Sequence, residues 1–177
     1  MLRSAASFIV LSLVAIQAAV ASTITPGTYL IQDVQSHLFL SILPAPPGLP
    51  LAPVVLVPNP EAIGTLWTVE KGVGNGILIS ARSGGPDDYQ MTHSGKEVIV
   101  SIHKTPETSW HTEEVGGGPD VVTINLSNDD NFITSNEHAR PQVTLQDSYG
   151  AGNQYFRFIR IKRSLYHRTH FTIQDSC

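Results

Sequence analysis

The chain has 177 residues, of which 41% are hydrophobic and 15% are charged, and its formal net charge is −4 at pH 7. A mildly acidic chain without a cluster of basic residues lacks the electrostatic pattern of a nucleic-acid-binding protein, so no nucleic-acid partner is expected. Cys177 is the single cysteine, so no disulfide forms within the chain. The fold must therefore be stabilised by core packing, and we expect a terminal, exposed thiol at Cys177.

Residues 1–21 have the features of a secretory signal peptide. Arg3 supplies a short positive region, Ala5–Val20 is an apolar run with few polar interruptions, and Ala19-Val20-Ala21 matches the small-x-small pattern of a cleavage site. A membrane-spanning helix needs roughly 20 consecutive apolar residues, which this run does not reach. The pattern predicts a secreted protein that does not contact the membrane once the signal has been cleaved.

Cleavage after Ala21 leaves 177 − 21 = 156 residues, which is the size of a single domain with a substantial core. Short runs rich in β-branched and aromatic residues lie between clusters of Gly, Pro, Asn and Asp, and no sustained helical periodicity is present. This pattern predicts an all-β domain over 22–163. In chain order the predicted strands form three groups of four: Thr28–Asp33, Leu38–Ile42, Val54–Val57 and Leu66–Glu70; Gly76–Ala81, Tyr89–His93, Val98–His103 and Ser109–Glu114; Val121–Asn125, Phe132–Ser135, Gln142–Gln146 and Tyr155–Ile161.

Each group ends near an aromatic residue in a similar setting. These residues are Trp67, Trp110 and Phe156, with spacings of 110 − 67 = 43 and 156 − 110 = 46. A repeat of this kind predicts a β-trefoil, in which three four-stranded units close and cap a small barrel around a pseudo-threefold axis. A β-sandwich or another barrel is the alternative. The tail over 164–177 lies beyond the third unit and either packs on the barrel or extends freely.

Motifs for catalysis or metal binding are not found. The sequence has no nucleophile elbow, zinc-protease motif or phosphate-binding loop, and the pairs of adjacent carboxylates lie at turns. His167 and His170 would face opposite sides of a strand. We therefore expect no catalytic residue, no metal and no cofactor. Asn125-Leu126-Ser127 is a glycosylation sequon, whose use depends on the exposure of Asn125.

The segment from Leu43 to Pro53 holds five prolines and three leucines. Proline fixes φ near −65° and favours extended backbone, so this connection should be stiff. Two interpretations are open. Its leucines either contact a partner or fold back onto the barrel as a cap.

A resemblance to a known family follows from three stretches, Pro26–Asp33, Val54–Val57 and Leu66–Glu70. They resemble the β-trefoil serine-protease inhibitors of mushrooms, of the cospin type, and more loosely the mycocypins. The resemblance implies an inhibitory loop between the second and third strands of the first repeat, which here is the segment from Leu43 to Pro53. The implied partner is a protease, serine type favoured, and the implied origin is fungal.

In the mechanism that this family implies, the loop enters the protease cleft as an extended strand and one side chain fills the specificity pocket. A residue followed by proline is poorly presented, which counts against Leu43 and Leu49. Leu51, between Pro50 and Ala52, is therefore the predicted pocket residue. It suits chymotrypsin- or subtilisin-like enzymes rather than trypsin. Asn75, in a glycine-rich turn, is interpreted as a turn residue, with an asparagine-specific protease as the alternative target.

The alternative function is that of a carbohydrate-binding, ricin-B-like lectin. Those proteins carry Gln-x-Trp in each repeat, whereas Trp67 and Trp110 lack the glutamine two residues before them. Gln154-Tyr155-Phe156 comes nearest, with Asp129 or Asp130 as a possible neighbour of the site. Core packing explains these aromatic residues without a sugar.

Overall fold

The computed structural model describes residues 24–43, 51–62, 64–82, 88–102, 108–116, 118, 120–126, 130–136, 142–147 and 152–162. The predicted signal peptide over 1–21 and the predicted tail over 164–177, with its cysteine, lie outside the described residues. So do Leu49 and Pro50 of the predicted inhibitory segment.

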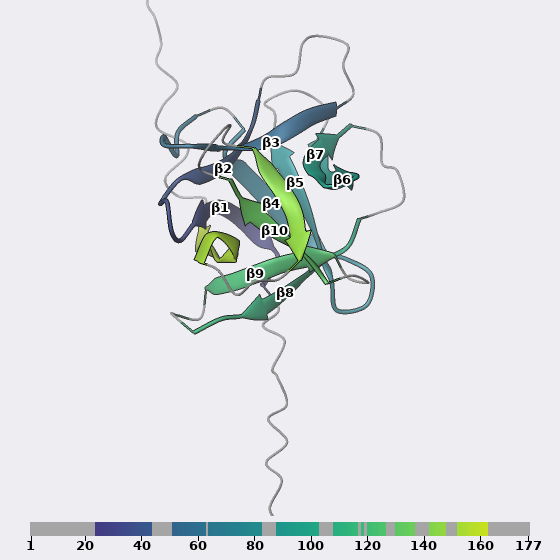
Figure 1. Cartoon of the computed structure of the whole chain (residues 1–177). Coiled ribbons are helices and arrows are strands. Elements are labelled where there is room, and N and C mark those ends of the chain that lie inside the picture. The colour runs from purple at the N-terminus through teal and green to yellow at the C-terminus, as the bar shows by residue number, and fades with distance from the viewer. Residues whose placement is uncertain are drawn as a thin grey trace, which may run out of the picture.

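The described chain consists of twelve strands and one short 3₁₀ helix (Figure 1). Each of the twelve strands overlaps one predicted run, so the all-β prediction is confirmed. The elements are β1 (Gly27–Asp33), β2 (Phe39–Ile42), β3 (Leu51–Val57), β4 (Leu66–Lys71), β5 (Ile77–Arg82), β6 (Asp88–Ser94), β7 (Glu97–Ser101), β8 (Trp110–Glu114), β9 (Val121–Leu126), β10 (Asn131–Ser135), β11 (Val143–Asp147), η1 (Gly152–Gln154) and β12 (Phe156–Arg160).

Six strands form a closed antiparallel ring. β1 pairs with β4, β4 with β5, β5 with β8, β8 with β9, β9 with β12, and β12 returns to β1. A closed ring leaves none of these strands with an unpaired edge, which is the usual protection against edge-to-edge aggregation. The last pairing places Tyr29 opposite Arg160 and so joins the two ends of the described chain.

The other six strands form three antiparallel hairpins, β2–β3, β6–β7 and β10–β11. β7 also pairs with both β3 and β11, so the hairpins are joined to one another. Buried apolar side chains from the ring and from the hairpins belong to one core cluster. The hairpins therefore pack on the ring rather than standing apart from it.

Two tryptophans link the ring to the hairpins through matching hydrogen bonds. Trp67 and Trp110 are both fully buried. The Trp67 indole N–H donates to the carbonyl oxygen of Leu40 in β2 at 2.9 Å, and the Trp110 indole N–H donates to that of Met91 in β6 at 3.2 Å. Phe156, the third aromatic residue of the predicted series, is also fully buried. Burial of an indole is favourable because its one polar group has a partner.

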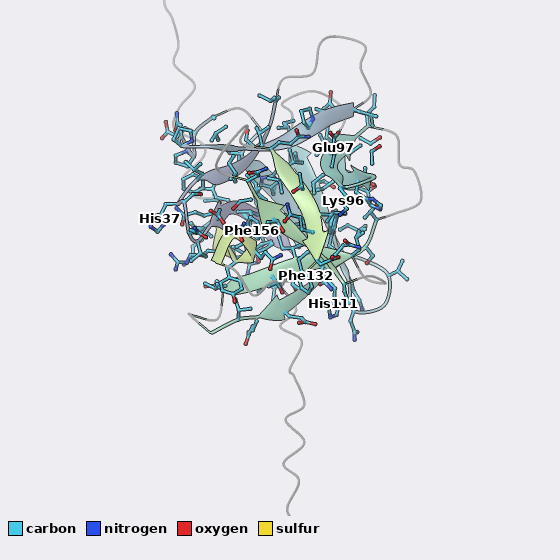
Figure 2. All side chains as sticks on the ribbon, in the orientation of Figure 1. His37, Lys96, Glu97, His111, Phe132 and Phe156 are labelled. Carbon is cyan, nitrogen blue, oxygen red and sulfur yellow. The ribbon has the colours of Figure 1, made fainter. Side chains whose placement is uncertain are left out.

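The turn between β1 and β2 holds a residue in the left-handed region. The Asp33 carboxylate accepts hydrogen bonds from the backbone N–H and the hydroxyl of Ser36, and the His37 N–H donates to the Asp33 carbonyl oxygen at 3.0 Å. His37 has φ of 61° and an exposed side chain, and it lies at the edge of the domain in Figure 2. A residue with a Cβ pays a steric cost in this conformation.

His37→Gly should therefore stabilise the protein by up to about 1 kcal/mol, because glycine adopts positive φ without that cost. For a chain of this size the melting temperature should rise by about 2–4 °C per kcal/mol, which differential scanning fluorimetry would measure. Gly95 is the matched control, since it has φ of +58° and a Cβ added there would meet no atom within 4 Å. Gly95→Ala should lower the melting temperature by a similar amount. A lower melting temperature for His37→Gly would contradict the described turn.

Candidate functional site

Both ends of the predicted inhibitory segment are held by backbone hydrogen bonds. On one side the Leu43 N–H donates to the Pro53 carbonyl oxygen at 3.3 Å, which continues the β2–β3 pairing beyond Ile42 and Val54. On the other side β3 pairs with β7, with Leu51 opposite Ser101. The described residues on both sides of 44–50 thus belong to a paired stem.

The stem presents two leucines to solvent. Leu43 and Leu51 are each 47% exposed, and among the described residues the one other exposed large hydrophobic side chain is Val73. Ile42 and Val54, on the same strands, are buried. Leu43 and Leu51 therefore do not fold onto the barrel as a cap, and their contact with a partner stays a prediction.

These two leucines lie on the same face of the hairpin. Leu43 stands opposite Pro53, and Pro53 and Leu51 are two residues apart on one strand, so their side chains emerge on one side. Leu43 and Leu51 are then diagonal neighbours across the strand pair. With the half-buried Pro53 they place three apolar side chains on one side of the hairpin, here called the leucine face.

The structure corrects one expectation about this segment. β3 begins at Leu51 rather than at Val54, because Leu51, Ala52 and Pro53 pair with Ser101, Val100 and Ile99 of β7. Prolines do not prevent this, since a strand accepts proline where no N–H is required. Ala52 is 1% exposed. Its side chain faces the core, so Ala52 lies in the predicted inhibitory segment without offering that side chain to a protease.

Asn125 lies in β9 between two neighbouring strands, opposite His111 of β8 and Phe132 of β10. The residue is half-buried, and its Oδ1 atom is buried with no hydrogen-bond partner among the described residues. Ser127 of the sequon lies outside the described residues. Glycosylation at Asn125 therefore stays a prediction.

Gln154 and Asp130 are the described residues that had suggested a sugar site, and Gln154 has a structural role. Gln154 is 1% exposed, and its amide Nε2 donates to the Thr134 hydroxyl and to the Asp147 carbonyl oxygen, both at 3.2 Å. Asp130 is exposed, and Asp129 lies outside the described residues. The Gln154 amide thus forms hydrogen bonds within the protein. It does so at the position where the likeness to Gln-x-Trp had suggested a sugar ligand.

Within the part of the chain that the structure describes, no group of three or more His, Cys, Asp or Glu side chains is placed to hold a metal ion. None of the described helical structure is long and apolar enough to cross a membrane.

Comparisons with known proteins bear on the fold. No protein-family model and no curated protein sequence matches the chain. Among solved structures, a proteinase inhibitor from Coprinopsis cinerea matches with a TM-score of 0.63 and 17% identity, over 78% of this chain and 99% of the inhibitor. The BEL β-trefoil matches with a TM-score of 0.57 and 15% identity, over 76% of this chain and 93% of that protein. The chain shares the β-trefoil fold.

A third trefoil of similar likeness is the ricin B-like lectin of Macrolepiota procera, solved in complex with lactose. It matches with a TM-score of 0.59 and 12% identity, over 78% of this chain and 99% of the lectin. The inhibitor and the lectin thus resemble this trefoil to nearly the same degree, and at these identities the likeness concerns the fold alone.

Proposed function

We propose that this trefoil is a secreted protease inhibitor that docks its 43–53 segment in the active site of a serine protease. The single observation that carries the proposal is the leucine face, an exposed apolar surface on a stem whose backbone is held on both sides. Exposed apolar side chains on such a stem are costly in solvent and useful in an interface. The proposed inhibitor comprises 22–163, released by cleavage after Ala21.

We further infer that the three predicted groups of four strands are trefoil repeats. Each group supplies two strands to the ring and one hairpin above it, as in β1 and β4 with the β2–β3 hairpin. The recurrence of an indole-to-carbonyl hydrogen bond in the first two groups supports this inference.

In the proposed mechanism the stem lowers the entropic cost of binding. A segment whose two ends are already paired loses less conformational freedom on docking than a free peptide does. Pairing of Leu51 with Ser101 of β7 holds the Leu51 backbone, while its side chain stays available to a partner. Leu51 is therefore the proposed pocket residue, and it matches proteases whose specificity pocket is apolar. Trypsin is a poor target because its pocket requires Arg or Lys.

The experiment that tests this function titrates the secreted protein against chymotrypsin, subtilisin, trypsin and papain. We expect stoichiometric inhibition of chymotrypsin or subtilisin and none of trypsin or papain, since an apolar side chain fills an apolar pocket. Inhibition of papain alone would place the target among cysteine proteases, and inhibition of none of the four would contradict the proposal.

Carbohydrate binding is the second candidate, favoured by the likeness to the Macrolepiota procera lectin. The internal hydrogen bonds of the buried Gln154 argue against a sugar site at that position. A glycan array run in parallel with the titration separates the two functions. Binding to glycans without inhibition of any protease would support the lectin.

A further inference from the structure

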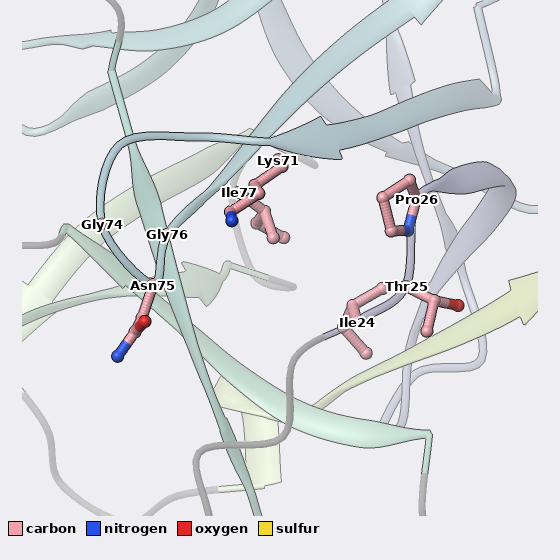
Figure 3. A pocket seen from close by; sticks show the side chains of 8 residues that line it. All are labelled: Ile24, Thr25, Pro26, Lys71, Gly74, Asn75, Gly76 and Ile77. Atoms are coloured by element: carbon pink, nitrogen blue, oxygen red, sulfur yellow. The ribbon is translucent and has the colours of Figure 1, made fainter.

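A pocket of about 290 Å³ lies at the end of β1 that is opposite to the β1–β2 turn (Figure 3). One wall is the chain just before β1, with Ile24 and Pro26, and the other is the end of β4, the β4–β5 turn and the start of β5. Its volume lies just below the range of about 300–1,000 Å³ that is usual for ligand pockets. None of the described residues of the 43–53 segment lines it.

Hydrogen bonds hold the wall that precedes β1. The Tyr29 hydroxyl donates to the Thr25 carbonyl oxygen at 2.6 Å. Arg160, from β12, donates to the Thr25 hydroxyl at 3.3 Å and to the Pro26 carbonyl oxygen at 3.2 Å. This short segment is thus attached to the ring by side chains of two different strands.

The turn that forms the opposite wall is closed by its own backbone. The Gly72 N–H donates to the Gly76 carbonyl oxygen at 2.9 Å, and the Gly76 N–H donates to the Val73 carbonyl oxygen at 3.1 Å. The Ser109 hydroxyl donates to the same Val73 oxygen at 3.4 Å. A side chain at position 76 would be crowded, since a Cβ there would clash with the Ser109 hydroxyl oxygen and lie 3.1 Å from the Trp110 carbonyl oxygen. Because both walls are held in place, the pocket exists before any ligand binds.

The chemistry of the lining combines an apolar floor with one cation. Ile24 and Ile77 are 7% and 4% exposed, so they present apolar surface at the bottom of the pocket. Among the described residues that line it, Lys71 is the single charged one, and its side chain is exposed. Figure 3 shows Lys71 and Ile77 next to each other, across the pocket from Ile24 and Pro26.

We propose that this pocket binds a small carboxylic acid with a short, branched alkyl group. The ammonium of Lys71 would pair with the carboxylate, and the alkyl group would pack between Ile24, Pro26 and Ile77. One ammonium matches the single negative charge of a monocarboxylate, and the volume of the pocket matches a small ligand. This ligand site is independent of the proposed inhibition.

The test is a titration of the secreted protein with 4-methylpentanoate, followed by amide chemical shifts in two-dimensional NMR. We expect saturable shifts at Gly74, Gly76 and Ile77. The uncharged analogue 4-methylpentanamide has nearly the same shape and should bind at least about fivefold more weakly, because it lacks the charge that Lys71 attracts.

Lys71→Gln should weaken binding of the acid by a similar factor and leave binding of the amide nearly unchanged. Lys162→Gln is the matched control, since it removes an exposed lysine that does not line the pocket. Three results would each overturn the proposal: no saturable shift, equal binding of acid and amide, or equal weakening by the two lysine variants. Protease inhibition should be the same in all three proteins, so failure here is distinct from failure of the inhibitor proposal.

Discussion

Trp67→Ala is expected to lower the free energy of unfolding by about 3–5 kcal/mol, the range for truncation of a large aromatic side chain in a packed core. Trp67 is fully buried, and its ring packs in the cluster that joins β4 to the hairpins. The substitution leaves a cavity and removes the hydrogen bond to the Leu40 carbonyl oxygen. Equilibrium unfolding in urea, followed by far-UV circular dichroism, would measure the loss.

Trp67→Phe separates the two contributions. Phenylalanine keeps most of the buried volume but has no N–H, so the Leu40 carbonyl oxygen loses its indole donor, at a cost of about 1–3 kcal/mol. The third strand group supports tolerance of this change, because Phe156 is fully buried at the corresponding place. We expect Trp67→Phe to fold and to be less destabilised than Trp67→Ala. Equal destabilisation by the two substitutions would mean that ring volume matters little at this position.

Leu51→Asp is expected to weaken inhibition of the target protease by a few kcal/mol, which corresponds to about a 100-fold or larger rise in the inhibition constant. A carboxylate at this position would have to enter an apolar specificity pocket without a partner. Leu51 is 47% exposed in the free protein, so the folded state should tolerate the charge. The inhibition constant would be measured against whichever protease the panel shows to be inhibited most strongly.

Val73→Asp is the matched control for this substitution. Val73 is 70% exposed, more than Leu51, and it lies in the β4–β5 turn rather than in the 43–53 segment. It should therefore leave the inhibition constant unchanged. Leu43→Asp should have a smaller effect than Leu51→Asp, since Leu43 contributes to the leucine face without entering the pocket. Wild-type inhibition by the Leu51→Asp variant would remove the 43–53 segment from the mechanism.

Much of the fold follows from local features of the sequence. β-branched and aromatic runs between Gly, Pro, Asn and Asp clusters predict all twelve strands, because both the extended conformation and the turns depend on neighbouring residues. Trp67, Trp110 and Phe156 lie in similar sequence settings, which predicts that all three side chains are buried, as they are. Local signals of this kind predict strands and turns without information about which strands pair.

Which described side chains of the 43–53 segment are exposed depends on strands that are distant in the sequence. Pairing with β7, whose Ser101 lies opposite Leu51, decides where β3 begins. The same pairing decides whether the Leu51 side chain is exposed or buried. The sequence pattern could not separate Leu51 from Ala52, although the first is half exposed and the second is buried. Strand pairing sets which face of the hairpin points to the core. A shift of the pairing by one residue would exchange the core-facing and the solvent-facing side chains.

The ligand pocket is likewise a product of tertiary structure. Its walls come from 24–26 and from 71–77, and its geometry relies on Ser109, just before β8, and on Arg160 of β12. None of these residues forms a motif in the chain. The sequence by itself determined the strands, the turns and the apolar character of the 43–53 segment, because these arise from local backbone preference and composition. Pairing of β3 with β2 and β7 decided the leucine face, and pairing within the ring decided the pocket, because both bring together side chains that are far apart in the sequence.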